Sequence, residues 1–556
     1  MGAGNLEIGR GFNAKPAFLQ QYYALYSQND WRPTNKLTVN LGLRWDAQPG
    51  VTDRHNRITS FDQTATNPYG GKGAFYFPGS NGASRRLWNS KWASFAPRLG
   101  VAYRFRENLV LRAGYGMTYL PSNTGYYGGP YNYGMQTFAP TTDAQPYGLN
   151  PAGAVVGDFA AVTRLVPPTN DDPKAPALYG SPNPRFDLNG YQNPRVHQAN
   201  AFIEWQKSGW QLAAGWSGAF GRTLATGGIY AVNNDQYLPM STLSAWRDNY
   251  ISRNGTGYTG NDQVTNPFQP ATGPLIPFLG NLGKARMALR ETMWPFPMFG
   301  TMGLERYIGT SDYNALQFRA NRQFASGLMI TAHYTWSKAM EVNGPMLQYN
   351  FGAEGYSFPT GNYIDYQQNR RLASNDIPHR AVATWLYQLP FGTGKRLNPS
   401  NSALKFLASD WQVSGTWMYQ SGTPILATGA SNGSLNGRPD VVSGVDMELP
   451  KEYQKWYDGR TKVTLPSGRV ITPCNLCFLK YNPDAFAGRT VRVPNGTLQR
   501  DQYWWGTAAF TYNAIRNDAL NNVTLSVQRL FKLTERLELS LQAHAHNALN
   551  HTQFSP

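Results

Sequence analysis

The segment Lys36–Asp46, which reads KLTVNLGLRWD, alternates strictly between apolar and polar side chains. In an extended chain one face would carry the odd-numbered residues Leu37, Val39, Leu41, Leu43 and Trp45. The other face would carry Lys36, Thr38, Asn40, Gly42 and Arg44. Because side chains along a strand point alternately to opposite sides, this pattern predicts a β-strand with one apolar and one polar face. The apolar face could meet a protein core or lipid, and the polar face an outer surface or a wet lumen.

The same alternation recurs in pairs of segments joined by short links. The pairs are 22–31 with 36–46, 94–105 with 108–119, 196–206 with 209–220, 313–323 with 328–337, 378–389 with 411–421, and 519–530 with 536–547. They predict about six antiparallel hairpins with strands of roughly ten to twelve residues, the length that a tilted strand needs to cross a bilayer.

The links between hairpins are long, and they fall at 47–93, 120–194, 221–299, 338–377 and 422–517. A sheet whose long loops all lie at one end is typical of an outer-membrane barrel, which has short periplasmic turns and long extracellular loops. Aromatic residues cluster at the strand ends, as in membrane-interface belts. Since an open sheet edge is costly in lipid, we expect the sheet to close. The predicted fold class is therefore all-β, an antiparallel transmembrane β-barrel.

Composition excludes several other classes. No apolar run reaches the eighteen or so residues of a membrane-spanning helix. The formal net charge is +17, but the basic residues are scattered and form no run or helix that would indicate nucleic-acid binding. The start of the chain, MGAGNLEIGRGFNAK, lacks the apolar region of a signal peptide. The chain is then either soluble or a piece of a longer exported precursor.

Several stretches resemble TonB-dependent outer-membrane receptors, in the branch common in Acidobacteria that carries a carboxypeptidase-regulatory-like domain before the plug. They are SQNDWRPTNKLTVNLGLRWD, DRHNRITSFD, FAPRLGVAYRF with LRAGYGMTYLP, SDYNALQFRANRQFASGLMITAHYTWSKAM, NDIPHRAVATWLYQLPFGTGKR, DWQVSGTWMYQSGTPI and LQAHAHNALNHTQF. They occur in the family's order from about residue 22 to the end. The resemblance implies a 22-stranded barrel in the outer membrane of a Gram-negative bacterium, contacting its lipid. It also implies capture of a scarce nutrient by the loops, a plug in the lumen, and energy from the TonB–ExbB–ExbD motor.

The sequence departs from that family at both ends. No TonB box, plug or signal peptide precedes Tyr22, and the closing strand of the family would follow Pro556. We therefore expect residues 1–21 to be the remnant of a preceding barrel or loop segment, and residues 22–556 to be a portion of the receptor barrel. Because its short turns would be periplasmic, the first strand here should run toward the periplasm and the last one outward. These directions fit the tenth to twenty-first strands of a full barrel.

No catalytic constellation stands out, and we expect no enzyme activity, cofactor or metal. The polar faces of four predicted strands carry the residues that we predict to line the lumen, namely Arg44, Arg112, Arg319, Glu538, His544 and His546. His544 and His546 could ligate a metal beside Glu538, but we favour ordinary lining of the lumen for them. Cys474 and Cys477, in PCNLC, lack the second pair of a zinc ribbon and indicate a local disulfide or two free thiols.

Ligand-binding candidates are loop aromatics, either in the Gly- and Asn-rich segment 126–138 or in the longest loop, 422–517. They are Tyr126, Tyr127, Tyr131, Tyr133, Trp456, Tyr457, Trp504 and Trp505. Flat rings with polar neighbours suit sugars, peptides or aryl chelates, but packing of the loops against one another would also explain them. The nutrient could be a siderophore, oligosaccharide or peptide. The alternative function is a secreted, soluble, β-rich carbohydrate-binding protein or adhesin, and a passive porin is disfavoured by the long loops.

Overall fold

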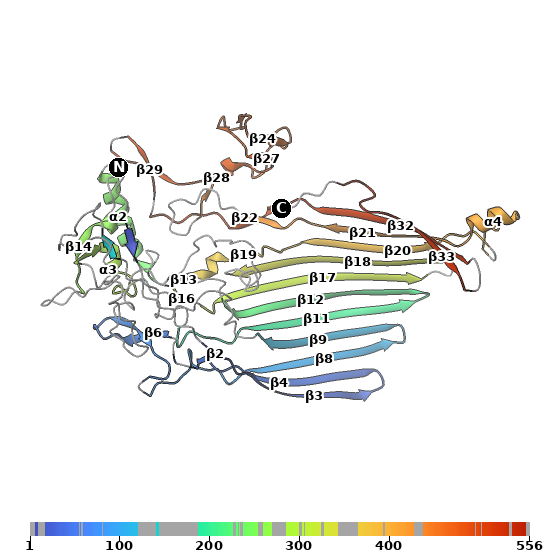
Figure 1. Ribbon diagram of the computed structural model, residues 1–556, viewed down its shortest axis with the longest axis horizontal. Coiled ribbons are helices and arrows are strands. Elements are labelled where there is room, and N and C mark those ends of the chain that lie inside the picture. The colour runs from blue at the N-terminus through green and yellow to red at the C-terminus, as the bar shows by residue number, and fades with distance from the viewer. Residues whose placement is uncertain are drawn as a thin grey trace.

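The computed structural model describes residues 6–8, 17–54, 56, 59–80, 82–120, 141–143, 187–225, 230–231, 233, 237–253, 259–268, 285–299, 303–304, 306–323, 327–342, 365–392, 395–426, 438–494, 496–501, 503–532 and 536–551. Its centre is a thirteen-stranded antiparallel sheet (Figure 1). The predicted fold class is confirmed at this level, since the chain is built of antiparallel strands with few helices.

Twelve strands of this sheet follow one another in sequence order, and each predicted hairpin is present. They are β3 (Tyr23–Thr34), β4 (Leu37–Ala47), β8 (Phe95–Arg106), β9 (Leu109–Tyr119), β11 (Arg195–Lys207), β12 (Trp210–Leu224), β17 (Gly309–Gln323), β18 (Leu328–Val342), β20 (His379–Gln388), β21 (Trp411–Gln420), β32 (Leu520–Lys532) and β33 (Glu538–Ala545). The short β19 (Arg371–Leu372) pairs with the end of β18.

The register keeps apolar and polar residues on separate faces across the strands. Between β17 and β18, Leu316 pairs with Trp336, and the next pair toward the long loops, Ala315 with Ser337, points the opposite way. On the polar face Arg319 lies opposite His333. The Trp336 side chain is 54% exposed. A continuous exposed band of such side chains on a sheet of this length is the surface that a membrane strand offers to lipid.

The two ends of the sheet differ as predicted. At one end the strands are joined by tight turns, for example at Ser208 and Gly209, whose φ angles are 50° and 80°. Two successive positive φ values are those of a type I′ turn, which matches the twist of a hairpin and favours glycine. The link between β20 and β21 adds α4 (Ser402–Ala408), whose first turn is capped because the Asn401 side chain accepts hydrogen bonds from the Ala403 and Leu404 amides.

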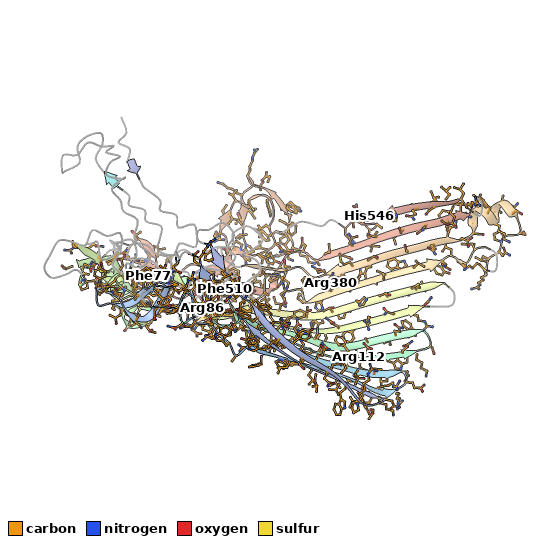
Figure 2. The ribbon with its side chains drawn as sticks, turned by 60° about the horizontal axis from the view of Figure 1, so that its bottom comes forward. Phe77, Arg86, Arg112, Arg380, Phe510 and His546 are labelled. Atoms are coloured by element: carbon orange, nitrogen blue, oxygen red, sulfur yellow. The ribbon has the colours of Figure 1, made fainter. Side chains whose placement is uncertain are left out.

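At the other end the long connections fold into small sheets, short helices and their own cores (Figures 1 and 2). The paired strands there are β1 (Leu6–Ile8) with β10 (Thr141–Asp143), β2 (Phe18–Leu19) with β5 (Thr52–Asp53), β6 (Ser60–Thr66) with β7 (Lys72–Tyr76), β13 (Tyr230–Ala231) with β16 (Gly303–Leu304), β14 (Gln263–Thr265) with β15 (Arg286–Ala288), β22 (Pro424–Leu426) with β31 (Thr511–Arg516), β23 (Asp440–Val441) with β28 (Phe486–Ala487), β24 (Trp456–Asp458) with β27 (Asn475–Phe478), β25 (Val463–Thr464) with β26 (Val470–Ile471), and β29 (Thr490–Arg492) with β30 (Leu498–Arg500). The helices are α2 (Met240–Ser252), α3 (Leu289–Thr292), η3 (Thr259–Asn261), η5 (Tyr366–Asn369) and η6 (Pro483–Ala485).

The buried apolar side chains of the protein gather in these loops. Phe61 is fully buried, and the centroid of its ring lies 5.3 Å from that of Phe296 and 5.4 Å from that of Phe299, both edge to face. Further cores form around Trp88 and Trp246. The sheet therefore presents its apolar residues outward, whereas the loops bury theirs.

The sheet of the described residues is open; the sequence predicted closure for the full barrel, of which this chain was expected to be a portion. Among the described residues, β3 pairs only with β4 and β33 only with β32, and the two edges lie on opposite sides of the sheet in Figure 1. The curvature over these twelve strands does not bring the edges within hydrogen-bonding reach of each other. None of the described helices is long and apolar enough to span a bilayer.

Candidate functional site

The polar face of the sheet carries an ionic cluster built from three strands. Glu204 on β11 accepts a hydrogen bond from Nε of Arg112 on β9 at 3.0 Å. Its other carboxylate oxygen lies 3.7 Å from Nη2 of Arg319, which comes from β17 on the far side of β12. Two of the predicted lumen residues, Arg112 and Arg319, thus meet on one carboxylate. Two arginines share one carboxylate, so the cluster keeps a net positive charge that anionic groups can reach. Because all three side chains are partly exposed, the ion pairs add little to the stability of the sheet.

Arg44 lies on the same face of β4, near the end of the strand that leads into the loops. Its Nε donates to Asp46 at 2.8 Å, and its Nη2 donates to the Tyr22 hydroxyl at 2.8 Å. That hydroxyl also donates to the Asp46 carboxylate. This triad fixes the segment before β3 against β4 and places Arg44 at the rim of the sheet.

The remaining predicted lumen residues belong to the edge strand β33 and the turn after it. Glu538 and His544 alternate with the leucines of the apolar face, and His544 shares a hydrogen bond through Nδ1 with the Ser526 hydroxyl. The rings of His544 and His546 are stacked with centroids 6.4 Å apart. Within the described part of the chain, no group of three His, Cys, Asp or Glu side chains is arranged to hold a metal ion.

The loops are fastened to the rim of the sheet by a buried ion pair. Nη2 of Arg516 donates to Oδ2 of Asp376 at 2.6 Å, and Nη1 donates to the Asp376 and Gly422 carbonyls at 3.0 and 3.1 Å. The other Asp376 carboxylate oxygen accepts from the Ala339 amide of β18 at 2.6 Å. One guanidinium therefore joins β31 to the connections that follow β18 and β21.

A second buried pair lies beside it. Nε of Arg371 donates to Glu341 at 2.9 Å, and the Arg371 guanidinium lies 5.6 Å from the centroid of the Phe510 ring. Arg438 stacks on the same ring at 5.2 Å, and burial lowers the pKa of its guanidinium. Our sequence reasoning missed these pairs, because the partners of each contact are far apart in sequence and no local pattern marks them.

The predicted ligand-binding aromatics have different environments. Trp456 is 47% exposed, and the edge of its ring packs against Phe478. Tyr457 is buried in a loop core with Leu449 and Val463, and Trp504 is also buried. Trp505 is half-buried. Tyr126, Tyr127, Tyr131 and Tyr133 lie outside the described residues. A ligand role remains a prediction, and Trp456 offers the most accessible ring among those that are described.

Of the predicted disulfide pair, Cys474 is disulfide-bonded. The sequence contains one other cysteine, Cys477, which belongs to strand β27. The bond lies in the last long loop, next to β24 and its exposed Trp456. Oxidised cysteines are typical of compartments outside the cytoplasm.

A family model described as an outer membrane beta barrel domain matches residues 7–556. The chain belongs to this family. It is therefore a protein of the Gram-negative outer membrane, and the exposed apolar face of its sheet is the side that meets lipid. In this outer-membrane sheet the tight turns are periplasmic and the long loops extracellular.

Comparison with solved structures finds weak similarity to several chains, including the following three. The FrpB iron transporter from Neisseria meningitidis (F3-3 variant) has a TM-score of 0.36 and 8% identity, over 97% of this chain and 41% of that one. The ferripyoverdine receptor of Pseudomonas aeruginosa has a TM-score of 0.34 and 9% identity, over 96% and 35%. The alcaligin receptor FauA from Bordetella pertussis has a TM-score of 0.31 and 9% identity, over 95% and 43%. The chain spans less than half the length of each of them.

Proposed function

We propose that this chain forms the larger part of the barrel of a TonB-dependent receptor, which imports a scarce nutrient across the outer membrane. The observation that carries this proposal is the extracellular cap. Its long loops have packed aromatic cores and are fastened to the sheet by buried ion pairs such as Arg516–Asp376. A structured cap is suited to holding a ligand, whereas a passive pore needs an open entrance.

The two open edges of the sheet support the further proposal that residues 22–556 pair with additional strands in a larger, 22-stranded barrel, with residues 1–21 belonging to a preceding segment. In lipid an unpaired edge leaves backbone groups unsatisfied, so β3 and β33 need neighbours. We also propose that a plug couples this barrel to TonB–ExbB–ExbD. The sequence stretches quoted above support placing it in the acidobacterial branch with a carboxypeptidase-regulatory-like domain.

For the nutrient we propose a siderophore, oligosaccharide or peptide. The exposed ring of Trp456 could stack on such a ligand, and the arginines of the polar face, among them Arg112 and Arg319, could guide anionic groups inward. Binding and gated passage require no bond to be broken, and we propose no enzymatic step. The alternative of a secreted soluble protein finds no support, because the outward face of the sheet is apolar.

An uptake assay in whole cells tests this function. Cells that express the chain within its native gene would be offered a labelled ferric hydroxamate, a labelled maltooligosaccharide and a labelled peptide mixture, with and without a proton uncoupler. We expect uptake of one probe to stop when the membrane is uncoupled, and Trp456→Ala to reduce binding of that probe by about tenfold or more.

The matched control is Trp31→Ala. Trp31 is 57% exposed, somewhat more than Trp456, but it lies at the periplasmic end of β3, and its replacement should leave binding unchanged. Uptake that continues at the same rate in uncoupled cells would identify a passive pore and refute the proposal.

A further inference from the structure

Arg529 occupies an unusual place for a charged residue in a membrane sheet. In β32 it pairs with Trp411 and with Leu541, so it belongs to the row of side chains that faces lipid. A charge on this face is costly unless its environment compensates for it. Arg529 is only 4% exposed, because α4 and the rings of Phe406, Trp411 and Phe531 cover it at the periplasmic end of the sheet.

Most of the guanidinium is committed to holding α4 in place. Its two terminal nitrogens donate to the carbonyls of Phe406 and Leu407 in the last turn of the helix. The guanidinium carbon lies 3.9 Å from the centroid of the Phe531 ring and 5.5 Å from that of Phe406. The Nε–H group, which is also buried, has no acceptor among the described residues. One charge-bearing donor is therefore left without a partner.

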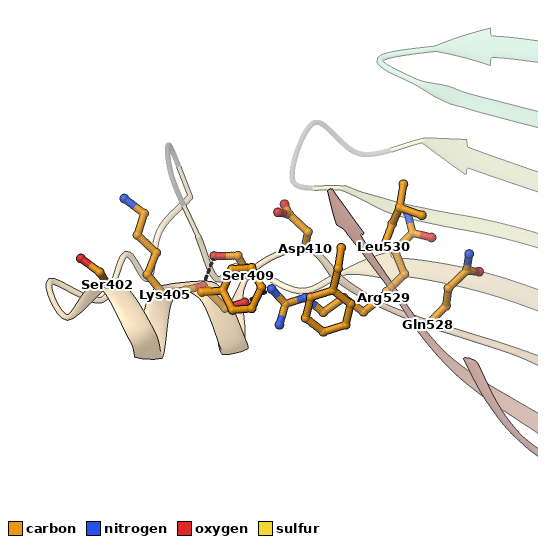
Figure 3. Close-up of a pocket in the computed structure, with 10 residues that line it drawn as sticks. Ser402, Lys405, Ser409, Asp410, Gln528, Arg529 and Leu530 are labelled. Carbon is orange, nitrogen blue, oxygen red and sulfur yellow. Dashed lines mark hydrogen bonds between the residues drawn. The ribbon is translucent and has the colours of Figure 1, made fainter. Parts of the chain in front are cut away.

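This donor belongs to a residue that lines a cavity of about 630 Å³ between α4 and the strand ends. The cavity is also lined by Lys405 on α4 and by Asp410, which precedes β21 (Figure 3). A cationic donor, Lys405, and a carboxylate, Asp410, among the lining residues match the phosphate and ammonium groups of a zwitterionic head group. Phe406 and Phe531 supply apolar walls of the same cavity.

The outer surface of α4 continues the apolar band of the sheet toward the periplasm. Leu404 and Leu407 are 59% and 60% exposed, which is unusual for leucines on a short helix in water. Lys395 and Arg396, in the link that leads to α4, are exposed as well. Apolar residues flanked by basic ones are typical of a segment that lies at the level of lipid head groups.

We propose that this cavity is a binding site for the head group of one phospholipid of the inner leaflet. Lys405 binds its phosphodiester, Arg529 holds α4 and therefore Lys405 in position, Asp410 faces its ammonium group, and Leu404 and Leu407 contact its acyl chains. Inorganic phosphate shares the first of these contacts but not the others, so the lipid is the expected ligand. The inference requires the chain to lie in the membrane and does not depend on nutrient uptake.

The test is the retention of phospholipid by the full chain after its extraction from outer membranes in mild detergent, measured by native mass spectrometry during titration with phosphatidylethanolamine. The wild-type protein should keep about one phospholipid, and Lys405→Gln should bind it about tenfold more weakly because one charge-assisted contact is lost. The matched control is Lys207→Gln. Lys207 lies on the lipid-facing row at the same end of another hairpin, which lacks a helix, and this variant should bind like the wild type.

A second variant, Arg529→Lys, keeps the charge but loses the planar fork that caps α4, so it should also release lipid while the β-sheet signal in circular dichroism is unchanged. Equal retention by Lys405→Gln and Lys207→Gln would overturn the proposal. Displacement of the lipid by inorganic phosphate at a comparable concentration would overturn it too, since the site would then recognise an anion alone.

Discussion

Replacing Arg516 with methionine should open the connection between the loops and the rim of the sheet. The substitution preserves much of the apolar stem but leaves the Asp376 carboxylate, which is 1% exposed, without its counter-charge. It also removes the donor to the Gly422 carbonyl and to the Asn513 side chain. Breaking a buried, hydrogen-bonded ion pair from one side typically costs about 3–5 kcal/mol.

We expect this loss to lower the free energy of local opening rather than that of the whole sheet. The ion pair joins segments separated by 140 residues and does not belong to the backbone pairing of the central sheet. A loss of about 3–5 kcal/mol raises the opening equilibrium by roughly two to three and a half orders of magnitude. Amide hydrogen exchange of the protein in lipid nanodiscs, followed on peptides covering 372–378 and 511–517, measures this change directly. The central strands should exchange as in the wild type.

The matched control is Arg469→Met, which removes an ion pair of similar length, 2.8 Å to Asp484, from a half-exposed arginine. This change should cost about 0–1 kcal/mol, or about fivefold at most in local opening. The double variant Asp376→Asn with Arg516→Met should be about 1–2 kcal/mol less destabilised than Arg516→Met alone, because no uncompensated charge remains. If Arg516→Met behaved like Arg469→Met, the reasoning from burial would be refuted.

Three further predictions concern other parts of the molecule. Ala332→Arg, in the middle of the lipid-facing row of β18, should lower the unfolding free energy by about 2–4 kcal/mol in a denaturant titration in lipid vesicles. Thr331→Arg, on the polar face, should lower it by less than about 1 kcal/mol. Equal losses would mean that the two faces are wrongly assigned. Glu204→Gln should change the unfolding free energy in the same titration by about 0–1 kcal/mol, since its partners Arg112 and Arg319 are half-exposed, and a larger loss would show that the cluster is shielded from water. Hydrogen bonds from the Thr461 and Arg460 amides hold the pKa of Asp458 below its usual range, so its turn should be fully stabilised above the ordinary carboxyl pKa and should loosen as pH falls through the lowered value. Limited proteolysis between pH 6 and pH 3 checks this expectation, and Asp458→Asn should lose the pH dependence.

Much of the sheet could be predicted because its signal is local. Strand Leu37–Ala47 follows the alternation of its own residues, and the placement of Arg112 and Arg319 on one face follows from the same period. The role of α4 could not be predicted in this way, because its segment is too short for a helical period and its fixation depends on Arg529, which is distant in sequence. Closure of the full barrel was expected because unpaired backbone groups at a sheet edge are costly in lipid. Whether the strands of this chain close by themselves depends on their number and curvature, and the described sheet is open.

The sequence by itself determined the strands, their two faces and the asymmetry between short turns and long loops, since period-two alternation acts through neighbouring residues. Only the tertiary structure decided which loop aromatics are buried, as Tyr457 and Trp504 are, and which remain exposed, as Trp456 is. It also decided that Asp376 meets Arg516 and that Arg529 lies beneath α4. These outcomes depend on contacts between segments far apart in the chain, which no local pattern encodes.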